Sequence, residues 1–136
     1  MRYLIRTGGV LLVLSICYLL LAGPVQQKQL NRRVKTLLLD VQEGLQKYHV
    51  EEEVYPKEMM SGRELIPFLA EGGFLDEKVL NPWVEDLYVN TGEVDDWLRY
   101  RTDQLAETYE LKALVPGSDG VHFRLDSVEN HSLEER

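Results

Sequence analysis

A run of 21 residues without a charged side chain, positions 7–27, restricts this chain more than any other feature. At about 1.5 Å per helical residue the run reaches roughly 30 Å, the thickness of the hydrocarbon core of a bilayer. Residues 10–22 are apolar except for Ser15, and Arg2 and Arg6 make the preceding segment basic. The sequence therefore predicts a basic leader at residues 1–6 and a transmembrane anchor at residues 7–27.

Two other targeting signals combine a basic start with an apolar run. A secretory signal peptide needs small residues before its cleavage site, but this run ends on Leu20 and Leu21 before Ala22. Residues 14–17 resemble a lipobox, although an isoleucine precedes Cys17 and the apolar run continues beyond it. We therefore favour an anchor that signal peptidase does not remove, with Cys17 as one more apolar residue inside it.

The segment that follows, residues 28–53, has apolar residues spaced alternately three and four apart. This spacing is typical of an amphipathic helix with one narrow apolar stripe. The stripe favours a helix packed on its own domain, and a coiled coil with a partner is the alternative. Glutamates at positions 51–53 predict a solvated helix end. The stripe residues expected to attach the globular domain are Leu30, Val34, Leu37, Val41 and Leu45.

A second helix is predicted to begin at Ser61, because Ser61 and Glu64 have the spacing of a capping box. Pro67 is expected near the start of this helix, and the glycines at 72–73 are expected to end it. The residues expected on its buried face are Leu65, Ile66, Phe68 and Leu69.

Beyond residue 75 the apolar period changes to two. It predicts strands at residues 98–102, 109–115 and 121–125, joined by loops of hairpin length. The expected fold is α+β: the N-terminal transmembrane helix continues into the long amphipathic helix, which covers the apolar face of a small antiparallel sheet. The globular domain is placed at residues 54–126, followed by a flexible tail at 127–136.

The charge of the chain argues against nucleic acid as a partner, and its cysteine content argues against an internal disulfide. From position 26 onward there are 23 Asp or Glu against 13 Lys or Arg, an acidic surface that repels nucleic acid. A single cysteine excludes a disulfide within the chain. Nucleic acid is therefore not expected among the partners.

No pattern of catalytic residues stands out. The adjacent Asp95 and Asp96, as neighbours on a strand, are expected to point to opposite faces. No nucleophile or phosphate-loop motif is present. The histidines lack ligand spacing and are interpreted as surface residues: His49, His122 and His131. We predict a protein that is not an enzyme, with no cofactor, no metal and no small-molecule substrate.

Three short sequences occur in the order typical of one family. Tyr55-Pro56 follows the long helix, residues 64–69 form a short apolar helix, and Asn81-Pro82-Trp83 follows that helix. Together with the anchor and the hairpin, they resemble the type IV pilins and the G-type pseudopilins of type II secretion over about residues 8–115. The resemblance implies a tyrosine-proline junction at Tyr55 and Pro56, and a turn in which Asn81 replaces the family's aspartate.

The resemblance also implies a location and partners. The protein would be a single-pass subunit of the bacterial inner membrane with a periplasmic C-terminal domain, although the Lys and Arg count taken alone favours the opposite orientation. Its partners would be membrane lipid and other pilin-like or secretion-machine subunits. Leader cleavage would follow Gly8. The residues that would pack against other subunits are Leu11, Leu12, Val13, Leu14 and Ile16.

Some family positions differ here. Val13 stands where the family has a glutamate that is thought to pair with the N-terminus of a neighbouring subunit. The chain is therefore expected either to remain unprocessed in the membrane or to belong with rarer subunits at a fibre tip. Val84 replaces a glycine, and Leu87 stands at a tyrosine position with Tyr88 one residue later, so the family's calcium loop is not transferred. The alternative function is a membrane-tethered periplasmic binding module that does not polymerise.

Overall fold

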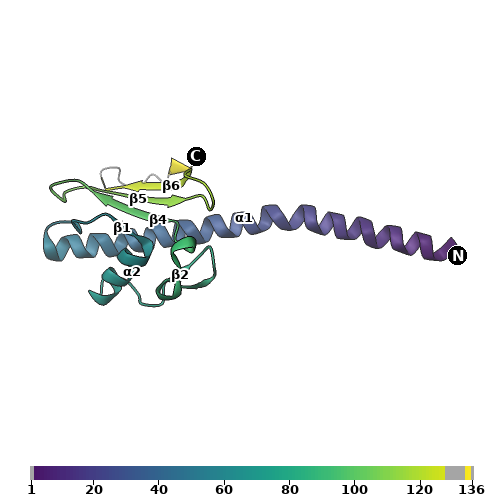
Figure 1. The fold of residues 1–136 in the computed structure, drawn as a ribbon, viewed down its shortest axis with the longest axis horizontal. Coiled ribbons are helices and arrows are strands. Elements are labelled where there is room, and N and C mark those ends of the chain that lie inside the picture. Colours follow the sequence, from purple (N-terminus) through teal and green to yellow (C-terminus); the bar gives the residue numbers. More distant parts are fainter. Residues whose placement is uncertain (1, 128–133, 136) are drawn as a thin grey trace. The chain divides into compact units, whose positions relative to one another are not determined.

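The computed structural model describes the backbone of residues 2–127 and 134–135 and the side chains of residues 23–127. The chain forms two compact units, Met1–Arg32 and Arg33–Arg136. The first unit is the beginning of helix α1 (Arg2–Glu52). The second, called the head below, contains the rest of α1 and all other elements (Figure 1).

Helix α1 contains both the predicted anchor and the amphipathic segment, which the sequence predicts as one continuing helix. It runs without interruption through Pro24, which lies inside it. It ends one residue before the predicted boundary, at Glu52, and its last glutamates are exposed as expected.

The predicted membrane anchor belongs to the first unit of the chain. Among the residues whose side chains are described, no helix is long and apolar enough to cross a membrane. Most of the anchor predicted at residues 7–27 lies outside that part of the chain. Most of the tail predicted at 127–136 likewise lies outside the described residues, although Glu134–Glu135 forms a short strand.

The main sheet has five antiparallel strands in the order β1-β4-β5-β6-β7. Its three longer strands form the predicted meander, and their bounds agree with the sequence to within one residue. The two edge strands were not predicted, because two residues are too few to show a period. The strands are β1 (Met60–Ser61), β4 (Leu98–Thr102), β5 (Tyr109–Leu114), β6 (Val121–Asp126) and β7 (Glu134–Glu135).

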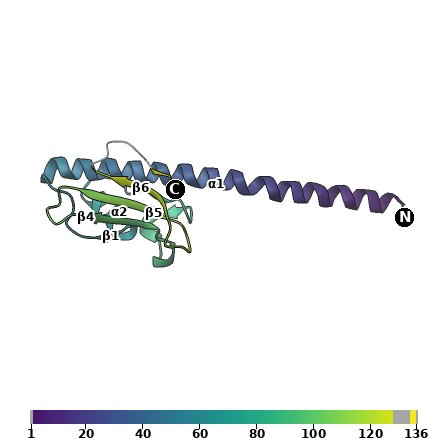
Figure 2. The same cartoon turned by 90° about the horizontal axis from the view of Figure 1, so that it is seen from above.

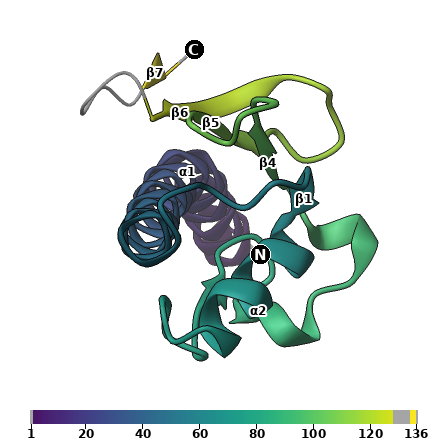
Figure 3. The ribbon, with the colours of Figure 1, turned by 90° about the vertical axis from the view of Figure 1, so that its left-hand side faces the viewer.

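The core of the head forms where the sheet lies along one side of α1 and α2 (Gly62–Glu71) lies along another (Figures 1 and 3). Figure 2 shows the same strands running beside the end of α1. Gly44 allows α1 to lie close to the segment that follows α2, since a β-carbon at position 44 would lie 3.2 Å from the carbonyl oxygen of Phe74. The inner face of the sheet is fully buried through Leu98, Tyr100, Leu111, Ala113, Phe123 and Leu125. The predicted α+β fold, with a long helix and a small antiparallel sheet, is confirmed.

Helix α2 begins where the capping box predicted. The Glu64 carboxylate accepts hydrogen bonds from the Ser61 backbone N–H and from its hydroxyl, both at 2.8 Å. The backbone bond in particular lowers the pKa of Glu64. Two predictions for this helix are wrong. Pro67 is its sixth residue rather than near its start, and Phe68 is 38% exposed, with its ring 5.5 Å from that of Tyr48.

The segment between α2 and β4 is more ordered than the sequence indicated. It contains a two-stranded ribbon and two 3₁₀ turns, none of which were predicted. Asp95 ends the second turn and Asp96 follows it, so the prediction that both lie on one strand is wrong. The elements are β2 (Leu80–Asn81), β3 (Asp86–Leu87), η1 (Tyr88–Asn90) and η2 (Glu93–Asp95).

Candidate functional site

The residues expected to contact other subunits lie in the first unit. Gly8 and its neighbours belong to the helical backbone of α1, and their side chains are outside the described part of the chain. This set comprises Gly8, Leu11, Leu12, Val13, Leu14 and Ile16.

The apolar stripe of α1 lies in the core of the head. Val34, Val41 and Leu45 are fully buried, and Leu37 is 3% exposed. Leu30, which belongs to the first unit, is half-buried. Within the head the stripe therefore packs on its own domain, and this part of it is not available for a coiled coil with a partner.

The Tyr55-Pro56 junction connects the end of α1 to the β4–β5 loop. The Tyr55 backbone N–H donates to the carbonyl of Ala106 at 2.8 Å, and the Tyr55 ring lies 4.4 Å from that of His49. The buried Pro56 offers its carbonyl to the hydroxyl of Tyr100 at 2.9 Å. The junction thus fixes the chain direction after the helix.

Tyrosine rings continue this cluster into the core. Tyr109 lies 4.7 Å from Tyr55 in an edge-on arrangement and stacks on Tyr100 at 6.1 Å. Burial raises the pKa of Tyr109 to about 12 and also raises the pKa of Tyr100, because a phenolate would lose its hydration there. His49 was expected at the surface but is half-buried beside this cluster.

His122 lies beside a different aromatic residue. His122, also half-buried, lies 4.2 Å from the ring of Phe123, and His131 lies outside the described residues. The described side chains bring no three His, Cys, Asp or Glu residues together as a metal site requires.

The turn at Asn81-Pro82-Trp83 is held by the Asn81 side chain, which is fully buried. Its amide nitrogen donates to the Thr91 hydroxyl at 3.0 Å and to the Asp95 carbonyl at 2.9 Å. Its amide oxygen accepts from the Trp83 backbone N–H at 3.0 Å. A carboxylate cannot donate, so asparagine at this position has a structural reason of its own. Pro82 is buried and Trp83 half-buried.

Asp96 has a structural role that its neighbours in the sequence do not indicate. Its carboxylate is 3% exposed and accepts from the backbone N–H groups of Gly62 and Arg63, at 3.2 and 2.9 Å, and of Leu98, at 3.2 Å. It thereby neutralises the amide end of α2. A β-carbon on Gly62 would lie 2.6 Å from this carboxylate, which explains the glycine.

Tyr88 lies beside this cap with its hydroxyl buried. The hydroxyl has no hydrogen-bond partner among the described residues. Burial, together with the charge of Asp96, raises the pKa of Tyr88. The unsatisfied hydroxyl is a cost to stability that the surrounding packing must offset.

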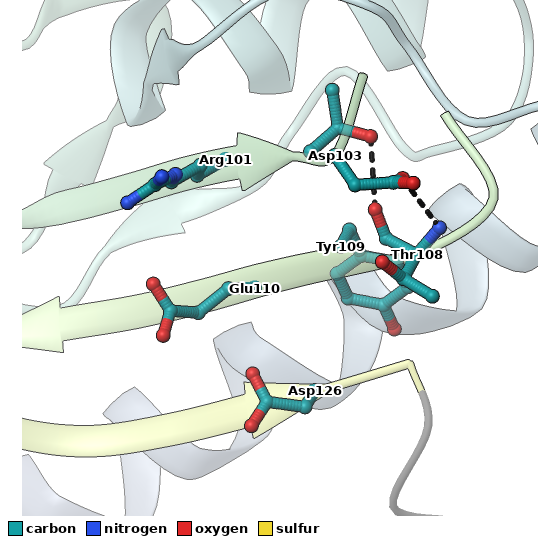
Figure 4. A pocket seen from close by; sticks show the side chains of 7 residues that line it. Arg101, Asp103, Thr108, Tyr109, Glu110 and Asp126 are labelled. Carbon is teal, nitrogen blue, oxygen red and sulfur yellow. Dashed lines mark hydrogen bonds between the residues drawn. The ribbon is translucent and has the colours of Figure 1, made fainter. Parts of the chain in front are cut away.

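The outer face of the sheet carries charged side chains on three neighbouring strands. Figure 4 shows Arg101, Glu110 and Asp126 side by side on three neighbouring strands. They line an open hollow of about 450 Å³. Its rim is closed by the β4–β5 loop, where the Thr108 N–H donates to Asp103 at 2.9 Å and lowers the pKa of that carboxyl. The charged side chains make this surface suited to charge recognition.

Comparison with known proteins adds no information about this site. No family model, curated protein or solved structure matches the chain. The pilin-like resemblance therefore stays a prediction from sequence.

Proposed function

We propose that this protein is a membrane-anchored, pilin- or pseudopilin-like structural subunit of a bacterial secretion or pilus-type envelope assembly. One observation carries the proposal: helix α1 is continuous from Arg2 to Glu52 and includes both the uncharged run and the stripe buried in the head. In a membrane, an uncharged helical segment of this kind can pack against the same segment of other copies. The α+β head supports the proposal as a small domain built around that helix.

Cross-linking in membranes tests this role. In a Cys17→Ser background, Leu12→Cys is expected to form disulfide-linked dimers when the full chain is oxidised in bacterial membranes. A cysteine at Lys78, on an exposed turn of the head, is the matched control and is expected to remain monomeric. If Leu11→Cys, Leu12→Cys, Leu14→Cys and Ile16→Cys all remain monomeric, lateral packing of this helix is wrong.

The alternative is a tethered periplasmic adaptor that does not polymerise. Val13 favours it, because the carboxylate that pilin-like subunits are thought to pair with a neighbour is replaced by an apolar residue. Intact-mass measurement of the protein from its own membranes separates the two. Loss of residues 1–8 supports the fibre-type subunit, whereas a retained N-terminus supports the adaptor.

Orientation needs its own measurement. With Cys17→Ser as background, Asp119→Cys places a thiol on the exposed β5–β6 loop. A membrane-impermeant maleimide is expected to label it when applied from the periplasmic side of intact cells. Labelling only after lysis would place the head in the cytoplasm and contradict the proposal.

A further inference from the structure

The charges of the head are segregated. Residues 33–127 contain ten Lys or Arg and twenty Asp or Glu. Four of the ten cations, but only two of the twenty acids, occupy neighbouring positions on the solvent side of β4, β5 and β6. This outer face is therefore basic on an otherwise acidic domain. It consists of Arg99, Arg101, Glu110, Lys112, Arg124 and Asp126.

The acids of the outer face are already engaged. Glu110 pairs with Lys112 at 2.6 Å and with Arg124 at 2.9 Å, and Arg124 also meets Asp126 at 3.0 Å. Arg101 lies opposite Glu110 in the sheet register, but no carboxylate among the described residues lies within ion-pair distance of it. An exposed cation without an ion pair is thus left on β4, at one corner of this surface.

Arg101 also lines two hollows on this surface. One is the hollow of about 450 Å³ shown in Figure 4. The other, about 560 Å³, combines the apolar side chains of Met59, Met60 and Leu114 with Arg99, Arg101 and Lys112. A surface of this kind fits a segment that carries both carboxylates and an apolar side chain.

The chain itself carries such a segment at the end of α1. Residues 51–53 are three exposed glutamates, and Val50 beside them is 81% exposed. We propose that the outer face binds this acidic helix end of a second copy. The contact joins two different surfaces, so it is heterologous and can extend from copy to copy. This contact is one interface of the proposed assembly, and the inference rests on that assembly role.

Charge reversal in the full chain tests the contact. Arg101→Glu reverses the outer face, and Glu52→Arg reverses the helix end. Each variant alone is expected to weaken self-association in detergent about tenfold or more, measured by sedimentation. An equimolar mixture of the two is expected to restore association, because each then offers the surface that the other has lost. A misfolded variant would not be rescued in this way.

The matched control is Lys78→Glu, which changes the net charge as Arg101→Glu does but lies off the sheet. It is expected to leave association unchanged. Raising the salt to 1 M, where the screening length falls to about 3 Å, is expected to weaken the wild-type contact. An equal effect of Lys78→Glu, or no rescue in the mixture, overturns the proposal. If the Leu12→Cys cross-link still forms in either case, the assembly role itself stands.

Discussion

The two faces of the β4–β5–β6 sheet are made of alternating residues of the same strands, yet they are determined by different forces. On the inner face the buried side chains are at most 4% exposed, and removal of this surface from water accounts for them. The outer face carries ion pairs such as that between Lys112 and Glu110. Because surface pairs contribute only about 0–1 kcal/mol each, folding alone does not explain why cations gather there. The inner face holds the domain together, and the outer face is available for recognition.

The sharpest contrast is between two neighbours on β6. Phe123→Ala removes a fully buried ring and is expected to lower the free energy of unfolding by about 3–5 kcal/mol. Arg124→Ala, on the opposite face, is expected to cost less than about 1 kcal/mol. Urea unfolding of the full chain in detergent, followed by tryptophan fluorescence, measures both, since Trp83 and Trp97 lie in the head. Equal losses would remove the distinction between the faces.

A smaller effect is expected from the buried carboxylate beside the inner face. Asp96→Ala leaves three backbone N–H groups without their acceptor and is expected to cost about 2–4 kcal/mol in the same assay. Asp95→Ala is the matched control, because the bond recorded at Asp95 involves its backbone carbonyl. A loss below about 1 kcal/mol for Asp96→Ala would show that water replaces the cap.

Raising the pH tests the inner face without changing the size of any side chain. The pKa of Tyr109 is raised from 10.0 to about 12, so the folded state keeps a proton that the unfolded chain loses. Stability is therefore expected to fall as pH rises above 10, by about 1 kcal/mol at pH 11 from this residue. Unfolding curves at pH 8 and pH 11 measure the loss. Tyr109→Phe is expected to reduce the difference between them, and an unchanged difference would assign the effect to other groups.

The smallest stability effect is expected at Arg101 on the outer face. Arg101→Gln removes an exposed cation without an ion pair among the described residues, so the free energy of unfolding is expected to change by less than about 0.5 kcal/mol. Self-association of the same variant should nevertheless weaken. A stability loss near that of Phe123→Ala would mean that Arg101 serves the fold rather than recognition.

Local chemistry explains which parts of the fold the sequence could predict. The period-two pattern located β4, β5 and β6, and Ser61 with Glu64 located the start of α2, because these signals involve residues at most a few positions apart. The buried stripe at residues 34–45 was predicted for the same reason.

Long-range contacts explain what was missed. Asp96 caps a helix that begins 34 residues earlier, and nothing near Asp96 in the sequence indicates that role. The segregation of charge onto one sheet face depends on register, which pairs Arg101 with Glu110 and Glu110 with Asp126. Phe68 was expected in the core by helical spacing, but the neighbouring Tyr48 ring covers only part of it.

The short edge strands have a further consequence for how the head meets other chains. Long strands occupy the middle of the sheet, while β1 and β7 at its margins have two residues each. Unpaired backbone groups along a long edge would recruit strands from neighbouring chains and lead to amyloid-like aggregation. Very short edge strands are one way in which proteins limit such pairing, so contacts between heads are expected to use side chains rather than shared strands.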